Sequence, residues 1–231
     1  MRNSCVLDKM EGCKKMKKNI LFDLDGTLFD TTEGIIESAW YAATKLGYER
    51  LPYEKMLQFV GPPIQESFMK HYNCTSNRAQ EATEIFRNYY KQGALFKAAP
   101  YEGIYELFDE LQALDIKMAV ATYKREDLAL KILGHFGMDK YCCSIHGADN
   151  NNKLKKSDII NICLNEMKGD RQESVLIGDT MNDARGAADA NIDFIAVTYG
   201  FGYKVKEELE KYPYIGVAKS PREILDLIKN L

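Results

Sequence analysis

Residues 19–28, with the sequence NILFDLDGTL, constrain the fold of this chain more than any other segment. An apolar run leads into two carboxylates, Asp23 and Asp25, and Gly26 then favours a turn. Residues two apart in an extended strand project to the same side, so both carboxylates are expected to face one point in space. Like charges at that distance repel each other, and a cation or a shared proton must compensate them.

A second segment, residues 174–183, repeats the pattern. Its apolar run ends at Gly178 and is followed by Asp179 and Asp183. Mg²⁺ takes several oxygen ligands in octahedral geometry, which makes it the natural occupant of such an acidic site. Aspartate is also common at strand ends and helix N-caps, so either segment alone could be a capping turn. Two such segments after two predicted strands favour a metal site.

From Gly103 onward, predicted helices alternate with predicted strands. The helices are expected at 104–114, 126–136, 157–167, 184–190 and 221–228, and the strands at 116–121, 144–146, 174–177, 194–197 and 214–217. Apolar strands separated by helices imply an α/β fold with a doubly wound parallel sheet. Its right-handed crossovers bring strand carboxyl ends to one edge, where such folds bind ligands. Asp23, Thr122 and Asp179 are all expected at such ends.

Residues 32–99 contain no strand pattern. A first helix is predicted from Thr32, as its cap, to Leu46, and Gly47 ends it. Further helical patterns cover 53–60, 64–72 and 77–92, and the stiff sequence Gly61-Pro62-Pro63 interrupts them.

These patterns predict three parts of the chain. Residues 19–31 and 100–231 form an α/β core domain, and residues 32–99 form an all-helical cap inserted into it. Residues 1–18 are polar and rich in lysine, and we expect a loosely ordered N-terminal extension.

Composition excludes several classes of protein. A formal net charge of −3 provides no basic field for nucleic acid. No apolar run approaches the length of a membrane span, and residues 1–18 lack the apolar core of a secretory signal. The six cysteines are scattered through a chain too large to need a disulfide framework, which indicates reduced thiols and a cytoplasmic protein. His146 lies near Cys142 and Cys143, but without a second paired set a zinc site is not expected.

The chain resembles the haloacid dehalogenase-like superfamily, specifically its phosphatase branch near phosphoglycolate phosphatases and 5′-nucleotidase-like relatives. The residues that meet the four motifs of that superfamily are, in chain order, Asp23, Asp25 and Thr27 for D-x-D-x-T, then Thr122, then Lys156, then Gly178, Asp179 and Asp183 for G-D-x-x-x-D. The motifs span most of the chain, and their order matches that of the family.

The resemblance implies a role for each acid. Asp23 would be the nucleophile that forms an aspartyl-phosphate. Asp25 would protonate the leaving alcohol and then take a proton from the attacking water. The carboxylates of Asp23 and Asp179, with the backbone carbonyl of Asp25, would hold Mg²⁺. Asp183 would not bind the metal directly and would instead orient metal-bound waters or Lys156.

The resemblance also implies two donors to the transferring phosphoryl group, the Thr122 hydroxyl and the Lys156 ammonium. Thr122 alone could equally be a strand-end cap. The lysine is ambiguous because Lys153 and Lys155 are close by in the sequence. Lys156 is favoured because the residues after it continue the family pattern.

Three further features have two interpretations each. Tyr123 follows Thr122 where relatives more often have a small residue, so its ring could narrow the pocket or pack beside the strand. The sequence Gly200-Phe201-Gly202 resembles a family loop near the site but could be a plain turn. Gly61 belongs to a segment that faces the active site in relatives, and it could bind substrate or mark an interhelical break.

The function expected from these observations is that of a Mg²⁺-dependent phosphatase acting on a small phosphomonoester, such as phosphoglycolate or a nucleoside monophosphate. A sugar-phosphate mutase shares every core motif and is the alternative enzyme. A non-catalytic binding module on the same fold would be expected to have lost the nucleophile or a metal ligand. True dehalogenases lack the acid at the position of Asp25. The protein is expected to be a monomer or a homodimer without a nucleic-acid or membrane partner.

Overall fold

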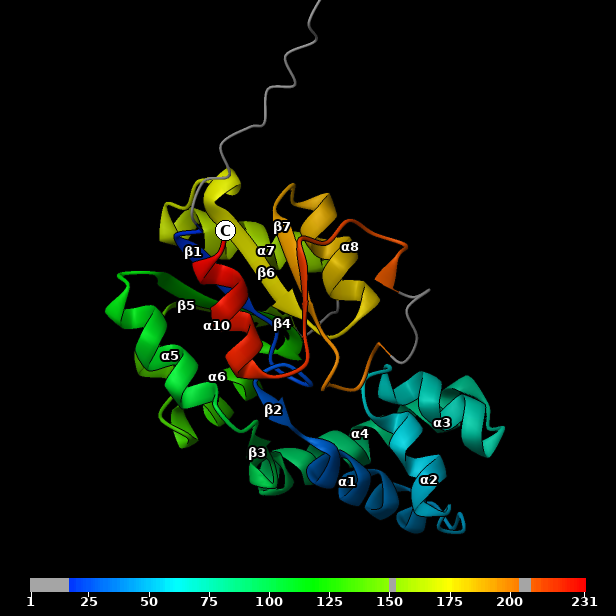
Figure 1. Ribbon diagram of the computed structural model, residues 1–231. Coiled ribbons are helices and arrows are strands. Elements are labelled where there is room, and N and C mark those ends of the chain that lie inside the picture. The colour runs from blue at the N-terminus through cyan, green and yellow to red at the C-terminus, as the bar shows by residue number, and fades with distance from the viewer. Residues whose placement is uncertain (1–16, 150–152, 204–208) are drawn as a thin grey trace, which may run out of the picture.

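A six-stranded parallel sheet forms the centre of the computed structural model, which describes residues 17–149, 153–203 and 209–231 (Figure 1). The strand order is β5-β4-β1-β6-β7-β8, and every neighbouring pair is parallel. The bounds are β1 Asn19–Phe22, β4 Lys117–Arg125, β5 Cys142–Ala148, β6 Ser174–Gly178, β7 Asp193–Val197 and β8 Gly216–Ala218. The predicted doubly wound α/β fold is therefore confirmed.

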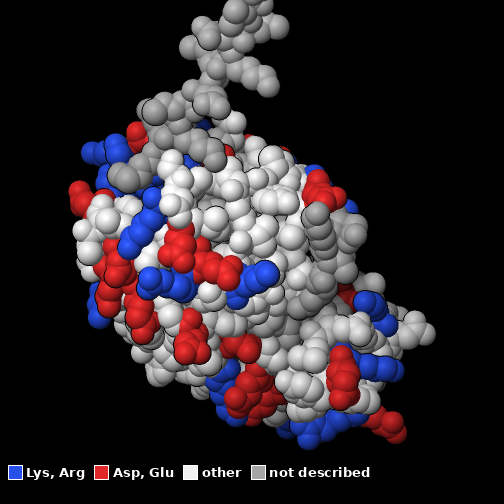
Figure 2. All heavy atoms as spheres, viewed as in Figure 1, with Lys and Arg blue, Asp and Glu red and all other residues white. Residues whose placement is uncertain are grey.

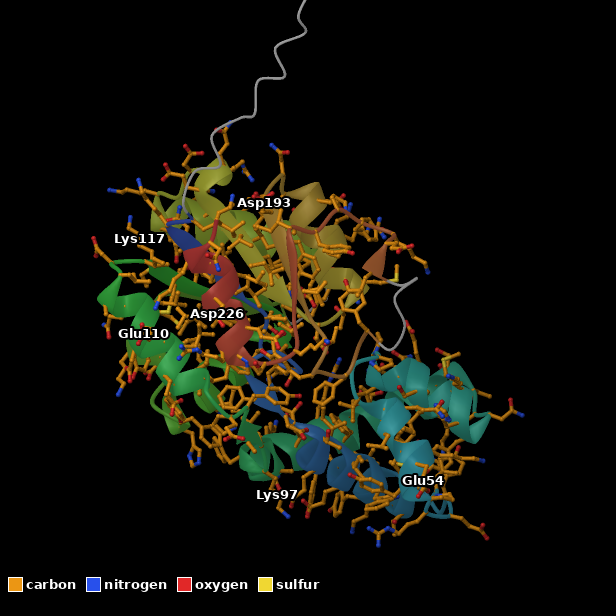
Figure 3. All side chains as sticks on the ribbon, viewed as in Figure 1. Glu54, Lys97, Glu110, Lys117, Asp193 and Asp226 are labelled. Atoms are coloured by element: carbon orange, nitrogen blue, oxygen red, sulfur yellow. The ribbon has the colours of Figure 1, made fainter. Side chains whose placement is uncertain are left out.

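Helices cover both faces of this sheet because alternate strand residues point to opposite sides. Ile20 and Phe22 pack in one apolar cluster with α5 (Ile104–Ala113), α6 (Glu126–His135) and α10 (Pro221–Lys229). Leu21 packs in the other cluster with α7 (Lys156–Met167) and α8 (Met181–Asp189). Glu110 of α5, labelled in Figure 3, lies at the surface. It forms an ion pair of 2.9 Å with Lys229 of α10.

A second sheet joins this core to a group of helices. Strands β2 (Phe29–Asp30) and β3 (Ala99–Pro100) pair antiparallel, and the chain between them forms α1 Thr32–Lys45, α2 Tyr53–Met56, α3 Ile64–Tyr72 and α4 Ser76–Gln92. These helices lie together below the sheet in the view of Figure 1. The helical insert is thus confirmed, whereas the boundary residues 32 and 99 stay a prediction. Residues 1–16 of the predicted N-terminal extension lie outside the described residues.

Some predicted elements differ in detail. Thr32 is the first residue of α1 rather than its cap, and its backbone N–H donates to Asp30 Oδ1 at 2.9 Å. The helix predicted for residues 53–60 is α2 followed by a 3₁₀ turn at Leu57–Phe59. Strands β2 and β3 were not predicted because two residues are too few to show a periodicity. Strand β4 continues to Arg125, four residues beyond its predicted end, and this places Lys124 in a strand.

Among the described residues, no helix combines the length and the apolar character needed to cross a membrane. On the face shown in Figure 2, basic and acidic residues are interspersed over the lower part of the molecule.

Candidate active site

The site lies at the carboxyl ends of three adjacent strands, β4, β1 and β6. Asp23 directly follows β1, Thr122 lies in β4, and Asp179 directly follows β6. All three side chains are buried. Asp23 and Thr122 are about a hundred positions apart in the sequence, and Thr122 and Asp179 are more than fifty apart. The parallel sheet brings them to one edge, as expected of such a fold.

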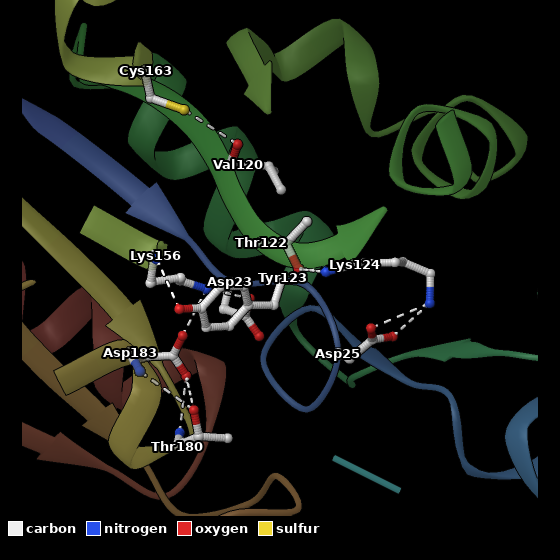
Figure 4. Close-up of polar contacts among 10 residues, drawn as sticks. All are labelled: Asp23, Asp25, Val120, Thr122, Tyr123, Lys124, Lys156, Cys163, Thr180 and Asp183. Carbon is white, nitrogen blue, oxygen red and sulfur yellow. Dashed lines mark hydrogen bonds and ion pairs between the residues drawn. The ribbon is translucent and has the colours of Figure 1, made fainter. Parts of the chain in front are cut away.

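Lys156 is the cation of this cluster. It is the first residue of α7, its side chain is 2% exposed, and its Nζ lies 2.6 Å from Asp23 Oδ1 and 2.7 Å from Asp183 Oδ1 (Figure 4). Lys153 and Lys155 are exposed. The geometry therefore favours Lys156 among the three lysines that the sequence left open, because it alone of them is placed against Asp23.

Tyr123 holds the start of α7. Its hydroxyl oxygen accepts a hydrogen bond of 2.9 Å from the backbone N–H of Lys156, one of the N–H groups that a helix leaves without an internal partner. Its ring centroid lies 5.7 Å from Lys156 Nζ, within the range of a cation–π contact. The ring therefore packs over the lysine instead of merely beside the strand.

A loop that follows β7 in the sequence holds Asp179. Its Oδ2 accepts backbone N–H donors from Phe201 at 2.7 Å and Gly202 at 3.0 Å, so the 200–202 loop does lie at the site. Gly26 packs against the same carboxylate with a φ of +82°, and a Cβ at this position would come within 2.2 Å of Asp179 Oδ2. Only glycine fits there, since other residues would meet both the carboxylate and an unfavourable backbone conformation.

The second carboxylate oxygen of Asp179 is suited to a metal ion. Oδ1 is buried and has no hydrogen-bond partner in the described part of the chain, an arrangement that is costly unless something else compensates it. Asp23, Asp179 and Asp183 each offer a carboxylate oxygen, and these three atoms lie within 4.8 Å of one another. Hard oxygen donors of this kind fit Mg²⁺.

Burial and repulsion between neighbouring carboxylates raise the pKa values of two of these acids. Burial raises the pKa of Asp23 to about 6, with Asp183 and Asp25 adding to the effect and Lys156 opposing it. Burial, Asp183 and Asp23 raise the pKa of Asp179 to about 8, although the two backbone N–H donors act in the other direction. A divalent cation among these oxygens would relieve the repulsion.

Asp183 has two roles at once. Its Oδ2 accepts from the backbone N–H of Thr180 at 3.0 Å and from the Thr180 hydroxyl at 2.6 Å, which forms a capping box at the start of α8. Its Oδ1 contacts Lys156. Asp183 therefore caps α8 and also pairs with Lys156, which itself pairs with Asp23.

Asp25 departs from the geometry that the strand argument predicted. β1 ends at Phe22, so Asp23 and Asp25 do not share the alternation of one strand. The two carboxylates have different cations, because Asp25 pairs with Lys124 at 2.9 Å whereas Asp23 pairs with Lys156 (Figure 4). Each carboxylate thus has a lysine of its own, and the expectation that a cation or a shared proton compensates the two acids stays a prediction.

Lys124 was missed by the sequence analysis. The available signal was its position two residues after Thr122, which places both side chains on one side of a strand that continues. The Thr122 hydroxyl oxygen accepts the backbone N–H of Lys124 at 3.1 Å, which leaves the hydroxyl proton of Thr122 free to be donated.

Gly61 is the predicted site residue that the described polar contacts do not connect to this cluster. It is exposed, its φ is +101°, and a Cβ there would have open space within 4 Å.

His146 is held between two carboxylates, with Nδ1 3.0 Å from Glu126 and Nε2 3.0 Å from Glu166. The four cysteines among the described residues are free.

Comparison with known proteins agrees with this geometry. The family model described as haloacid dehalogenase-like hydrolase matches residues 20–197. A 5′-nucleotidase of Pseudomonas aeruginosa is 34% identical over 185 residues, which cover 80% of this chain and 84% of that protein. A phosphoglycolate phosphatase of Agrobacterium fabrum is 30% identical over 197 residues, 82% of this chain and 84% of that protein.

Solved structures give the same result. A crystal structure described as a predicted phosphatase from Clostridium acetobutylicum superimposes with a TM-score of 0.84 at 33% identity, and the match covers 94% of this chain and 100% of that one. The family model covers well over half of the chain, and the sheet edge carries the acids and the lysine of the family motifs. The chain therefore belongs to the haloacid dehalogenase-like hydrolase family.

Proposed function

We propose that this enzyme is a Mg²⁺-dependent phosphatase that hydrolyses a small phosphomonoester through an aspartyl-phosphate on Asp23. The observation that carries the proposal is the arrangement around Asp23. Its carboxylate is buried, lies 2.6 Å from Lys156, and shares a cluster with Asp179, whose Oδ1 has no partner in the described part of the chain.

Each residue has a part in the proposed reaction. Asp23 attacks phosphorus while the bond to the leaving oxygen breaks, and Asp25 gives its proton to that oxygen. Water then attacks the phosphoryl group, the bond to Asp23 breaks, and Asp25 takes a proton from the water. Lys156 and the Thr122 hydroxyl donate hydrogen bonds to the transferring group.

The residues that would hold Mg²⁺ are the carboxylates of Asp23 and Asp179 and the backbone carbonyl of Asp25. The ion would neutralise phosphoryl oxygens and so allow one anion to approach another. Asp183 keeps Lys156 in place through the contact of 2.7 Å.

The substrate class is part of the proposal. Phosphoglycolate and nucleoside monophosphates are the first candidates, since relatives at about the 30% level are named phosphoglycolate phosphatase and 5′-nucleotidase. The mixed charges on the face in Figure 2 and the net charge of −3 suit a small substrate better than a nucleic acid. Specificity depends on the insert more than on the core motifs.

The test is a panel of phosphomonoesters with Mg²⁺ and with excess chelator. We expect phosphate release that needs Mg²⁺, and a covalent phosphoenzyme detectable by mass spectrometry after acid quenching. Asp23→Asn should abolish both signals, whereas Asp25→Asn should retain phosphorylation by an activated donor and release phosphate slowly. Conversion of one sugar phosphate into an isomer without phosphate release would instead favour a mutase. Full activity in chelator, or substantial activity of Asp23→Asn, would contradict the proposal.

A further inference from the structure

Lys124 is a buried cation outside the four family motifs. Its side chain is 6% exposed, and its Nζ donates to Asp25 Oδ1 at 2.9 Å, to Asp25 Oδ2 at 3.2 Å and to Tyr90 Oη at 2.8 Å. A protonated lysine has three N–H donors, and the Asp25 carboxylate and the Tyr90 hydroxyl accept from them. Burial lowers the pKa of Lys124, but Asp25 and Tyr90 outweigh it and raise the pKa above its usual value. The ammonium is therefore charged and fixed in position.

The end of β4 directs Lys124 to this position. The pairing of β4 with β5 changes register between Ala121 and Arg125, as in a β-bulge, which commonly re-aims side chains near active sites. The backbone N–H of Lys124 is tied to Thr122 Oγ1 at 3.1 Å. Lys124 thus comes from the strand segment that also supplies a proposed donor to the phosphoryl group.

Tyr90 reaches the same lysine from the helical insert. It lies in the last turn of α4, it is buried, and its ring stacks on Phe86 at a centroid distance of 5.5 Å. Lys124 Nζ is 4.9 Å from the centre of the Tyr90 ring, in addition to its hydrogen bond to the hydroxyl. Lys124 therefore connects the insert to Asp25.

The exposure of the two partners shows which group is presented to the site. The Asp25 side chain is 26% exposed, against 6% for Lys124, so the carboxylate keeps an open surface while the ammonium lies behind it. A buried ion pair by itself contributes little net stability. What this pair does fix is the direction of the carboxylate.

We propose that Lys124 and Tyr90 are positioning residues for Asp25, and that they orient its carboxylate toward the leaving oxygen when the insert is seated on the core. This inference rests on the proposed phosphatase function. In the proposed reaction Asp25 gives a proton to the leaving oxygen and then accepts one from the attacking water, so the direction of its carboxylate matters in both steps. Displacement of α4 removes the Tyr90 contact and loosens the lysine, so the acid is fixed only while the site is covered.

Two esters with different leaving groups test the role directly. 4-Nitrophenyl phosphate releases a stabilised phenolate and depends little on an acid, whereas glycerol 2-phosphate releases an alkoxide that must be protonated. We compare kcat/KM for both esters in the wild type, Tyr90→Phe and Lys124→Met. Tyr90→Phe keeps the ring and its packing on Phe86 and removes only the hydroxyl.

A neighbouring tyrosine provides the matched control. Tyr89 also lies in α4, but its hydroxyl donates a hydrogen bond of 2.9 Å to Glu37 Oε1 of α1, within the insert. Tyr89→Phe therefore removes a comparable hydrogen bond without touching Lys124.

The expected result is a change in the ratio of the two rates. A positioned acid contributes about 10²- to 10⁴-fold, so we expect the ratio of glycerol 2-phosphate to 4-nitrophenyl phosphate to fall about 100-fold in Lys124→Met and about tenfold in Tyr90→Phe. Tyr89→Phe should keep the wild-type ratio, and thermal melts confirm that each variant is folded. If Lys124→Met does not fold, Tyr90→Phe carries the test alone.

The outcomes separate the inference from the function. Equal losses on both esters, or an unchanged ratio in Tyr90→Phe, would overturn the positioning role and leave the phosphatase function standing. A wild-type protein that hydrolyses neither ester with Mg²⁺ would overturn both.

Discussion

Replacement of Asp179 by asparagine should separate the electrostatic cost of the acidic cluster from its use as a metal site. The wild-type carboxylate is fully buried, and its pKa is raised from 3.8 to about 8. Because the folded pKa is the higher one, the folded protein holds a proton that the unfolded chain has lost. This contribution to stability is complete below the unfolded pKa and disappears as the pH rises through the folded pKa.

The magnitude follows from the shift. Without Mg²⁺, the unfolding free energy of the wild type should fall by about 2 kcal/mol as the pH rises from about 6 to about 8, because of Asp179. The slope is about 1.4 kcal/mol per pH unit and becomes smaller near the folded pKa. In a chain of this size that is a fall of about 4 to 8 °C in Tm. The Asp179→Asn variant keeps a neutral side chain, so its Tm should change less, and at the higher pH it should be the more stable metal-free protein.

Mg²⁺ should reverse this order. A ligand present at about 100 times its Kd stabilises the folded state by about 2.7 kcal/mol, which corresponds to about 5 to 10 °C here. The wild type should gain this stability, and gain more at about pH 8 than at about pH 6, since the cation competes with protons for the carboxylates. Asp179→Asn should gain little at either pH.

The assay is thermal unfolding, followed by circular dichroism, at both pH values with Mg²⁺ and with chelator. Asp115→Asn is the matched control, because Asp115 is exposed and its φ of 57° suits asparagine equally well. A metal-free wild type that becomes more stable as the pH rises would refute the electrostatic reasoning. An Asp179→Asn variant that gains as much as the wild type from Mg²⁺ would refute the metal assignment.

Two further predictions concern other contacts. Tyr123→Phe removes the 2.9 Å hydrogen bond from the Lys156 backbone N–H but keeps the ring, so we expect kcat to fall about tenfold with folding intact, an effect of about 1.4 kcal/mol. Steady-state kinetics test this, and an unchanged kcat would make the contact purely structural. The second prediction concerns His146. Burial lowers the pKa of His146, but hydrogen bonds to Glu166 and Glu126 outweigh burial and raise the pKa above its usual value. The protonated imidazole therefore stabilises the fold below about pH 6.5, and this stabilisation is lost as the pH rises through the folded pKa. With saturating Mg²⁺, the Tm difference between wild type and His146→Gln should be largest near about pH 5.5 and decline above about pH 6.5, and a difference that grows with pH would show that the sign is wrong.

Much of the fold was predictable because its signals are local. The apolar runs before Asp23 and Gly178 are strands, and the helices between strands are amphipathic. The last predicted helix, 221–228, is α10, with Pro221 in its first turn after the Ser220 cap. Alternation of such elements leaves few arrangements other than a parallel sheet with its strand ends at one edge. The meeting of Asp23, Thr122 and Asp179 follows from that topology.

The tertiary structure decided what depends on contacts between distant segments. The family pattern favoured Lys156 over its neighbours, but its contact with Asp23 depends on where α7 begins in the folded chain. The separate cation of Asp25 depends on a β4 strand that continues past its predicted end and on a register shift against β5.

Tyr90 shows the limit most clearly. From the sequence it is one of several aromatic residues on an amphipathic helix, and helical periodicity places it in a core. Only the folded chain brings its hydroxyl to Lys124, 34 positions away, since that contact joins the insert to the core. The sequence by itself thus determined the chemistry that the sheet edge holds, through residue types at strand ends. How the charges are paired, and how the insert contacts them, was decided by packing between segments that no short-range pattern connects.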